Sequence, residues 1–278
     1  MPITVGEALA EACRKIDALD ARVLLCHVME RDAGYLIAHP DARLGSGRQH
    51  TLEALVARRR TGEPVAYITG RREFFGLDFK VTPAVLIPRP ETELLVELGL
   101  ERVPENQPCR VLDLGTGSGC IAISIARNRP LASVTATDNS SEALALAEEN
   151  ARALDVRNVD FAAGEWYAAV DDRRFDLIVS NPPYVADGDP HLAQGDLRFE
   201  PRAALIAGAE GLDAICRIVA HAATHLAAGG WLLFELGFDQ AACCRALLQA
   251  AGFGPIYAWK DVAGHDRVCG GQLDAPRH

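Results

Sequence analysis

The sequence predicts a doubly wound α/β sheet preceded by a small helical domain, with a β-hairpin linker joining the two. From residue 110 onward, apolar runs typical of strands alternate with segments of helical periodicity. The first 65 residues show helical periodicity only, and a chain of 278 residues has room for one large domain and one small one. We therefore predict a helical bundle over residues 1–65, a linker over 66–85 and a larger α/β domain over 86–278, which is called the catalytic domain below because the candidate site residues lie in it.

The helical bundle is predicted to begin at a capping box. Thr4 and Glu7 stand three residues apart, the spacing at which each side chain reaches the other residue's backbone N–H. The periodicity continues through residues 20–28 and 51–60. The apolar stripe predicted for the first helix consists of Leu9, Ala12, Cys13 and Ile16.

The linker and the start of the catalytic domain carry turn and helix signals. Residues 66–81 alternate and are rich in aromatic side chains, and Gly70 and Gly76 interrupt them, which predicts a β-hairpin. Pro90 suits the first position of a helix because its missing N–H has no intrahelical partner there. Glu91 and Glu93 would then lie in the positively polarised first turn.

The remaining elements predict a parallel sheet. Ligands of such sheets bind at the carboxyl ends of the strands, where Gly115, Asp138 and Asn181 all fall. The predicted strands lie near residues 110–114, 133–137, 158–161, 175–180 and 230–235, followed by a terminal pair near 255–259 and 266–269.

A glycine-rich turn follows the first of these strands. Residues 111–121 read Val-Leu-Asp-Leu-Gly-Thr-Gly-Ser-Gly-Cys-Ile, an apolar run that passes through glycines into a helical pattern. Glycines let a nucleotide approach the backbone closely, so the turn is a candidate cradle. A dinucleotide site is disfavoured, because its G-x-G-x-x-G spacing would place Cys120 at the third glycine. The candidate cofactor residues of the turn are Gly115, Thr116, Gly117, Ser118 and Gly119.

Two further side chains are candidates for holding a nucleoside. Asp138 ends an apolar run nineteen residues after Gly119, and a carboxylate at this place can accept both ribose hydroxyls. Its alternative role is to cap the next helix, which Ser140 could do instead. Trp166 could stack on an adenine or be an ordinary half-buried tryptophan.

A cluster of hydrogen-bond acceptors follows the strand at residues 175–180. Pro182 and Pro183 remove two backbone donors, which leaves the amide oxygen of Asn181 and unpaired carbonyls, with the Tyr184 ring beside them. Such a corner suits a planar NH₂ group, whose hydrogens need acceptors and whose face needs a flat neighbour. The alternative is a plain Pro-Pro loop, which the glycine turn upstream disfavours.

Charge and composition narrow the function classes. Residues 1–85 hold 12 Lys and Arg against 11 Asp and Glu, whereas residues 86–278 hold 16 against 27. An acidic catalytic part disfavours stable nucleic-acid binding, and the arginine run at 58–60 is interpreted as a solvated helix face. No apolar run reaches the roughly twenty residues that span a membrane. Eight cysteines without a C-x-x-C pair indicate buried thiols in a reducing compartment, so we expect a cytoplasmic protein without a metal site.

Taken together, these segments resemble class I S-adenosylmethionine-dependent methyltransferases that carry an Asn-Pro-Pro-Tyr amino-group site. They are most similar to the HemK-type protein-(glutamine-N5) methyltransferases. The similar segments lie between about residue 61 and residue 270 and occur in the same order as in that family. One residue departs from it, since relatives usually carry Asp where this chain has Glu165. Further matching segments are residues 74–76, 87–93, 200–205 and 261–268.

The resemblance implies a fold, a reaction and a set of residues. The fold would be Rossmann-like, and the enzyme would transfer a methyl group from S-adenosylmethionine to the N5 amide nitrogen of the Gly-Gly-Gln glutamine of peptide chain release factors. S-adenosylhomocysteine would be the product, translation termination would be modulated, and residues 1–65 would dock the partner. The catalytic residues would be Asn181, Pro182, Pro183 and Tyr184; the cofactor residues would be the glycine turn, Asp138, Trp166 and Asn181.

Several alternatives stay open at this point. An adenine-N6 DNA methyltransferase uses the same acceptor logic but must flip its base and usually needs a recognition domain or a basic surface. An RNA guanine-N2 methyltransferase and a donor-binding scaffold without activity are the others. A monomer is the default expectation. Arg89, Glu93 and Arg202 could line the pocket or stabilise loops, and the role of Glu165 is equally undecided.

Overall fold

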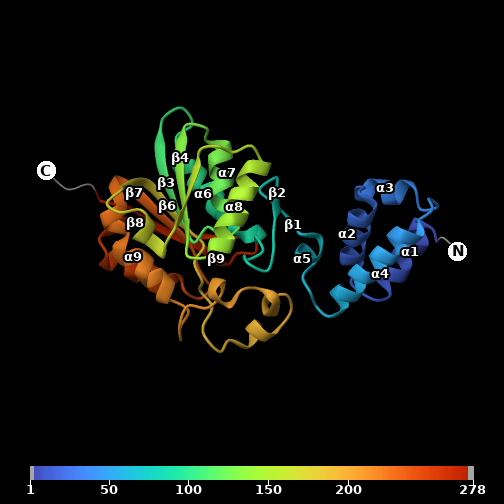
Figure 1. Cartoon of the computed structure of the whole chain (residues 1–278). Coiled ribbons are helices and arrows are strands. Elements are labelled where there is room, and N and C mark those ends of the chain that lie inside the picture. The colour runs from blue at the N-terminus through green and yellow to red at the C-terminus, as the bar shows by residue number, and fades with distance from the viewer. Residues whose placement is uncertain (1–2, 275–278) are drawn as a thin grey trace. The chain divides into compact units, whose positions relative to one another are not determined.

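The computed structural model describes residues 3–274, which form two compact units (Figure 1). The helical unit contains the residues up to Arg71 together with His191–Phe199. The catalytic unit contains Arg72–Pro190 and the chain from Glu200 onward. The assignment of residues 1–65, 66–85 and 86–278 to bundle, linker and catalytic domain stays a prediction.

The helical unit is a bundle around its own apolar core. Leu24, Leu25 and Leu44 are fully buried in it. The predicted capping box is present, because the Glu7 N–H donates to Thr4 Oγ1 at 3.2 Å and the Thr4 N–H donates to Glu7 Oε2 at 2.7 Å. The helices are α1 (Val5–Cys13), α2 (Ala18–Met29), α3 (Ala33–Ala38), α4 (Ser46–Arg60) and α5 (Val65–Thr69).

The predicted stripe of the first helix is partly wrong. Ala12 is buried, but Cys13 is exposed, and Val5 and Ala8 complete the buried face instead. The helix ends at Cys13, so Ile16 packs against the core from the turn that follows.

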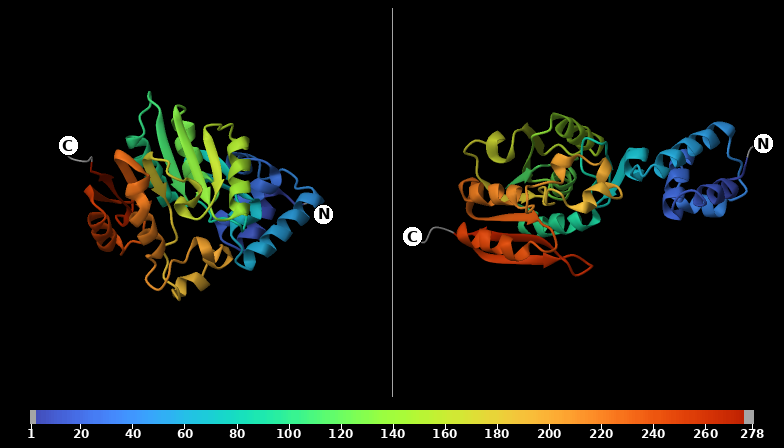
Figure 2. Two further views of the ribbon diagram at one scale, coloured as in Figure 1. Left: turned by 60° about the vertical axis from the view of Figure 1, so that its left-hand side comes forward. Right: turned by 90° about the horizontal axis from the view of Figure 1, so that it is seen from below.

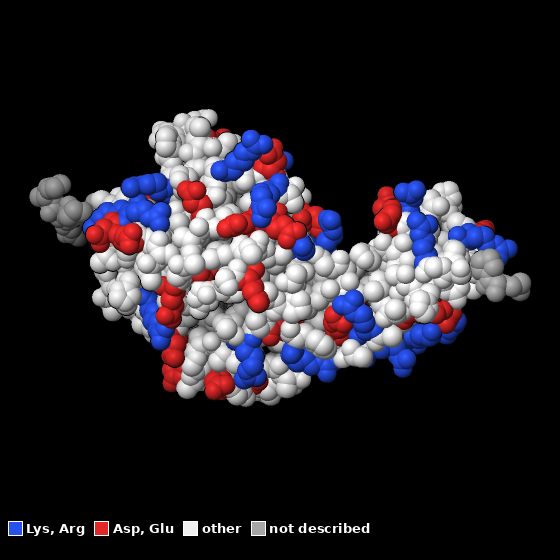
Figure 3. All heavy atoms as spheres, viewed as in Figure 1, with Lys and Arg blue, Asp and Glu red and all other residues white. Residues whose placement is uncertain are grey.

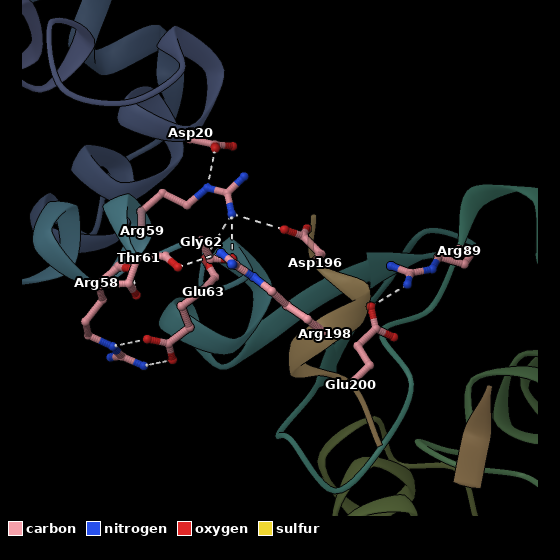
Figure 4. A network of polar contacts seen from close by, with 10 residues as sticks. All are labelled: Asp20, Arg58, Arg59, Thr61, Gly62, Glu63, Arg89, Asp196, Arg198 and Glu200. Carbon is pink, nitrogen blue, oxygen red and sulfur yellow. Dashed lines mark hydrogen bonds and ion pairs between the residues drawn. The ribbon is translucent and has the colours of Figure 1, made fainter. Parts of the chain in front are cut away.

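The segment His191–Phe199 packs on the helical unit through two arginines (Figure 4). The Arg59 guanidinium donates to Asp20 Oδ2 at 2.6 Å and to Asp196 Oδ1 at 3.1 Å. Arg198 Nη2 donates to the Thr61 carbonyl oxygen at 2.6 Å. The interpretation of the arginine run as a solvated face is therefore wrong for Arg59, whose guanidinium ties this segment to the bundle.

The hairpin begins later than the sequence predicts. Residues Val65–Thr69 form α5, and the strands β1 (Arg71–Phe74) and β2 (Leu77–Lys80) follow it. The tight turn has positive φ at Phe75 and Gly76, and the Phe75 N–H donates to Glu93 Oε1 at 2.9 Å. The buried side chains Phe74 and Phe79 join the core of the catalytic unit.

A seven-stranded sheet forms the centre of the catalytic unit. Its order is β5-β4-β3-β6-β7-β9-β8; β5, β4, β3, β6 and β7 are parallel, and β9 runs antiparallel to both of its neighbours. This is the predicted doubly wound arrangement. The strands are β3 (Cys109–Leu114), β4 (Ala132–Asp138), β5 (Val159–Ala163), β6 (Phe175–Ser180), β7 (Leu226–Glu235), β8 (Phe253–Lys260) and β9 (Asp266–Leu273).

Helices cover both faces of this sheet (Figure 2). The helices α6 (Glu93–Arg102), α7 (Cys120–Asn128) and α8 (Ser141–Ala153) pack on one face, and α9 (Asp213–His225) and α10 (Ala241–Ala250) on the other. Strand side chains alternate between the two cores because successive residues of a strand point to opposite faces. Val111 and Leu177 belong to the first core, and their neighbours Leu112 and Ile178 to the second.

Local signals fix the starts of two helices near the site. Pro90 opens the 3₁₀ turn η1 (Pro90–Thr92), which leads directly into α6 as the sequence predicts. Ser140 caps α8, since its hydroxyl accepts from the Ala143 N–H at 3.2 Å. Asp138 is therefore left available for another role.

The surface charges, the lengths of the helices and the exposure of the cysteines can be compared with what the composition predicts. Basic and acidic side chains are interspersed over the face of the molecule drawn in Figure 3. None of the helices in residues 3–274 is long and apolar enough to cross a membrane. All eight cysteines are free thiols, but the expectation that they are buried is wrong for Cys13, Cys216 and Cys243, which are exposed, and only partly right for Cys26, which is half-buried.

The φ angle of Gly119 and the side chains around it predict how much an alanine at this position would lower the free energy of unfolding. Its φ is +82°, and a Cβ there would lie 2.7 Å from Ile123 Cδ1 and 3.1 Å from Ala147 Cβ. Gly252 has the same kind of φ, +83°, with nothing within 4 Å. In urea denaturation we expect Gly252→Ala to cost about 1–2 kcal/mol from backbone strain alone. Gly119→Ala should cost about 1–3 kcal/mol more, because the added methyl overpacks the contact of α7 with α8.

Equal losses in the two variants would contradict the packing argument. Circular dichroism of each folded variant checks that the comparison is made between native-like states.

Candidate active site

A cavity of about 330 Å³ lies in the catalytic unit at the carboxyl ends of β3, β4 and β6. Leu114 pairs with both Thr137 and Ser180, so the residues that follow these strands are brought together. The lining residues are Pro83, Ala84, Val85, Leu86, Pro88, Arg89, Thr92, Gly115, Thr116, Gly117, Ser118, Cys120, Ile121, Asp138, Asn139, Ser140, Glu142, Ala143, Gly164, Glu165, Trp166, Asn181, Pro183, Pro201, Ala203 and Ala204.

The glycine turn forms one wall of this cavity. Gly115 and Gly117 have φ of +71° and +56°, a backbone that glycine adopts without strain. A Cβ on Gly117 would meet no atom within 4 Å, so the turn leaves room for close approach of a ligand. Gly119 does not line the cavity, and its missing side chain instead allows α7 to approach α8.

Asp138 is fixed at the edge of the cavity by two backbone donors. Its Oδ2 accepts from the Gly117 N–H and its Oδ1 from the Ser140 N–H, both at 2.9 Å. A carboxylate has about four lone-pair sites, so two such bonds orient the group and leave capacity for further donors. The carboxylate is thus suited to a ligand that presents hydroxyl groups.

Trp166 and Glu165 form the adjoining wall. Trp166 is half-buried, and its Cζ3 would lie 3.5 Å from a Cβ placed on Gly115. The tryptophan therefore closes over the start of the glycine turn, with its ring available to a flat ligand. Glu165 also lines the cavity and accepts from Arg217 Nη1 at 2.7 Å.

The acceptor corner lies at the end of β6. Asn181 and Pro183 line the cavity, whereas Pro182 is buried behind them. Within residues 3–274 no backbone hydrogen bond ends on the Pro182 carbonyl oxygen. Tyr184 does not line the cavity, and its hydroxyl donates to Glu235 Oε1 at 3.0 Å.

A buried carboxylate behind this corner was missed by the sequence reasoning. Glu235, at the end of β7, and Thr92, in η1, are each 1% exposed. The Thr92 hydroxyl donates to Glu235 Oε2 at 2.6 Å, and Asn181 Nδ2 donates to Thr92 Oγ1 at 3.1 Å. Burial raises the pKa of Glu235, while the bonds from Thr92 and Tyr184 act in the opposite direction. The sequence feature that could have identified Glu235 is its position as an acidic residue at the carboxyl end of a predicted strand.

The loop segments opposite the sheet close the cavity. Arg89 lines it and donates to Glu200, whose other oxygen accepts from the Ile87 N–H at 3.3 Å. Figure 4 includes the Arg89–Glu200 pair. Glu93 holds the hairpin turn, and Arg202 is a surface residue 3.8 Å from Asp187, so neither of these two lines the cavity.

Asp113 is the buried carboxyl directly before the glycine turn. Burial raises its pKa to about 7, against hydrogen bonds from the Thr116 hydroxyl and the Ala122 backbone. Thr116 Oγ1 donates to Asp113 Oδ2 at 2.7 Å, so this carboxyl fixes the turn from beneath.

A glycine cradle, an acidic strand end and an amide-acceptor corner at one edge of a doubly wound sheet are the features of an α/β methyltransferase. A family model described as methyltransferase small domain matches residues 91–197, and one described as PrmC N-terminal domain matches residues 5–70.

Curated relatives match almost the whole chain. A release factor glutamine methyltransferase from Xylella fastidiosa is 50% identical, covering 95% of this chain and 96% of the relative. Proteins with the same name from Vibrio cholerae and Burkholderia pseudomallei are 47% and 51% identical; the first covers 100% of this chain and 99% of the relative, the second 98% and 97%. The chain therefore belongs to the release factor glutamine methyltransferase family.

Solved structures show the same fold at lower identity. A methyltransferase from Pyrococcus furiosus has a TM-score of 0.56 at 19% identity, covering 83% of this chain and 100% of its own. A 16S rRNA N2 G1207 methyltransferase from T. thermophilus, solved with AdoMet and guanosine, has a TM-score of 0.54 at 22% identity and covers 73% and 49%.

The raised pKa of Asp113 predicts a pH dependence of stability. Between the ordinary value of 3.8 and about 7, the unfolded chain has lost the proton that the folded chain retains. The free energy of unfolding therefore falls as pH rises through this window, by up to about 1.4 kcal/mol per pH unit. Asp113→Asn cannot titrate, so urea denaturation between pH 4.5 and 6.5 should give a flatter slope than the wild type.

Asp172→Asn, a change at an exposed carboxylate, is the matched control and should keep the wild-type slope. Parallel curves for the wild type and Asp113→Asn would contradict the assignment.

Proposed function

We propose that the protein transfers a methyl group from S-adenosylmethionine to the N5 amide nitrogen of a glutamine, the one in the Gly-Gly-Gln motif of peptide chain release factors. The observation that carries this proposal is the Asn181 corner, where acceptors and almost no donors meet a cavity that has room for a nucleoside. Family membership supports the choice of substrate, since the relatives are named for it. The helical unit is the proposed docking part for the release factor.

The cavity suits S-adenosylmethionine by its shape and donors. We assign the ribose hydroxyls to Asp138, the adenine to the Trp166 side, and the amino-acid end to the turn around Gly115 and Gly117. When bound, S-adenosylmethionine supplies an electrophilic methyl group on a sulfonium sulfur. Its positive charge suits a catalytic part with an excess of acidic residues.

The Asn181 corner activates the incoming amide. An amide nitrogen is a weak nucleophile because its lone pair is delocalised into the carbonyl. The Asn181 side-chain oxygen and the Pro182 carbonyl oxygen accept one hydrogen each from the NH₂ group and turn the nitrogen toward the methyl. The same oxygens stabilise the positive charge that develops on nitrogen, and fixed orientation removes much of the entropic barrier.

No general base is required before methyl transfer in this scheme. The proton leaves the nitrogen after the new N–C bond has formed, when the group has become acidic. Pro183 shapes the cavity beside Asn181. Tyr184 supports the corner from behind, since its hydroxyl is held by Glu235 and its carbonyl accepts from Gln240 Nε2 at 3.0 Å.

The first experiment is mass spectrometry of a recombinant release factor before and after incubation with the enzyme and S-adenosylmethionine. We expect a gain of one methyl group on the Gly-Gly-Gln glutamine. Parallel incubations contain RNA and DNA with labelled donor. Label on nucleic acid alone would overturn the protein-substrate assignment in favour of an RNA guanine-N2 or DNA adenine-N6 activity.

Asn181→Ala should lower kcat by about 10²–10³-fold, the usual effect of losing one charge-stabilising group. The affinity for S-adenosylmethionine should change much less, because the amide acts on the substrate nitrogen. Gln249→Ala, which truncates an exposed amide on α10, is the control. Equal losses of rate and of cofactor affinity would make Asn181 a binding residue and defeat the proposed role.

Asp138→Ala should weaken S-adenosylmethionine binding by about 10–100-fold, since hydrogen bonds to a charged group contribute about 1.5–3 kcal/mol. Calorimetric titration with S-adenosylhomocysteine measures this without turnover. Asp160→Ala, at an exposed position of β5, should bind normally. Unchanged affinity in Asp138→Ala would remove the ribose assignment.

A further inference from the structure

Behind the acceptor corner, Glu235, Thr92 and Asn181 form a directed chain of hydrogen bonds. Ser180 and Phe234 are paired across β6 and β7, so Asn181 and Glu235 are the next residues of two adjacent strands. Thr92 reaches the same place from η1, on a separate part of the chain. The two bonds are 3.1 Å for Asn181–Thr92 and 2.6 Å for Thr92–Glu235.

The direction of each bond follows from the chemistry of the groups. An ionised carboxylate only accepts, and a hydroxyl has a single hydrogen to donate. The 2.6 Å separation is typical of an O–H···O⁻ bond, so the Thr92 hydrogen goes to Glu235. Only lone pairs of Thr92 then remain for Asn181, which must therefore turn its NH₂ group toward Thr92. The Asn181 oxygen is left to face the cavity.

Both oxygens of Glu235 accept hydrogen bonds in the order that this chain requires, because Thr92 donates to Oε2 at 2.6 Å and Tyr184 donates to Oε1 at 3.0 Å. Burial raises the pKa of Glu235; these two hydrogen bonds and the Arg267 guanidinium lower it, against Glu91, which raises it. Arg267 is itself held by Asp261 at 3.3 Å. A protonated Glu235 would reverse the chain, since Thr92 would then donate to the Asn181 oxygen and the NH₂ group would face the substrate.

The Thr92 hydroxyl is committed to this chain of hydrogen bonds. Thr92 is the last residue of η1 and continues with helical φ and ψ into α6, where its side chain makes no capping bond. Its hydroxyl instead lies between Asn181 and Glu235.

We propose that Glu235 and Thr92 are positioning residues that fix the side-chain amide of Asn181 with its oxygen, and not its NH₂ group, toward the substrate nitrogen. This inference rests on the proposed function and identifies what makes the Asn181 corner an acceptor. Neither residue transfers a group. Both act through Asn181, whose amide would otherwise be free to present either edge.

Thr92→Val keeps the side-chain shape and removes the hydroxyl, which leaves the Asn181 NH₂ group without its buried acceptor and favours turning that group toward the cavity. We expect kcat for release-factor methylation to fall by about 10–100-fold, with the Kd for S-adenosylhomocysteine within about threefold of the wild type. Thr92→Ser restores the hydroxyl and should recover kcat to within about threefold of the wild type. Thr135→Val makes the same change at a buried position of β4 outside the cavity and should retain wild-type kcat.

Wild-type kcat in Thr92→Val, or equal losses in Thr92→Val and Thr92→Ser, would overturn the proposal. Thermal unfolding of each variant is measured alongside. If Thr92→Val does not fold, Glu235→Gln replaces it, and a kcat within twofold of the wild type in that variant would likewise overturn the proposal. A wild-type enzyme that fails to methylate release factor would refute the proposed function, but it would not refute the chain of hydrogen bonds that orients Asn181.

A second readout does not require activity. Selective ¹⁵N labelling of asparagine resolves the Asn181 side-chain NH₂ signals, identified by their loss in Asn181→Ala. In the wild type, the hydrogen bonded to Thr92 should exchange with solvent at least about tenfold more slowly than in Thr92→Val, because bonded amide hydrogens exchange only on opening. Identical exchange rates and chemical shifts in the two proteins would overturn the proposal that Thr92 orients the Asn181 amide.

Discussion

Parallel strands end side by side, and the chemistry of this molecule depends on that geometric constraint. The register of β4, β3, β6 and β7 places Asp138, Gly115, Asn181 and Glu235 side by side, in this order, along one edge of the sheet. Backbone hydrogen bonds of the ladder hold this edge rigid. Side chains that begin there are positioned by the strands themselves and require few loop contacts. The glycine turn and the acceptor corner are thus parts of one scaffold.

Buried carboxylates stabilise the loops around this edge. Asp113 lies beneath the glycine turn and binds Thr116, Glu200 holds the Ile87–Arg89 loop, and Glu235 supports the acceptor corner. A buried carboxyl group is costly unless it is hydrogen-bonded. Each of these carboxyls binds the groups that it orients, so removing a partner leaves a further polar atom unpaired. These hydrogen bonds between buried carboxyls and loop groups hold the loops around the site in place.

Small changes in backbone geometry decide which residues line the cavity. Gly117 is open to the cavity, whereas Gly119, two residues later, is pressed against Ile123 and Ala147. The two glycines have the same φ sign, but Gly117 lines the cavity and Gly119 allows close packing of two helices. The same division separates Asn181, which lines the cavity, from Tyr184, which supports it.

The sequence by itself determined the fold class and the strand ends, because these depend on local periodicity, and its motifs with fixed spacing indicated side chains that share one cavity. The alternation after residue 110 predicts the sheet, and residues 115–118, Asp138, Trp166 and Asn181 all line that cavity. Only the tertiary structure decided which residues far apart in the sequence contact one another. Thr92 and Glu235 lie 143 residues apart and meet at Asn181, and His191–Phe199 packs on the helical unit, because long-range contacts follow from strand order and packing, which no local pattern encodes.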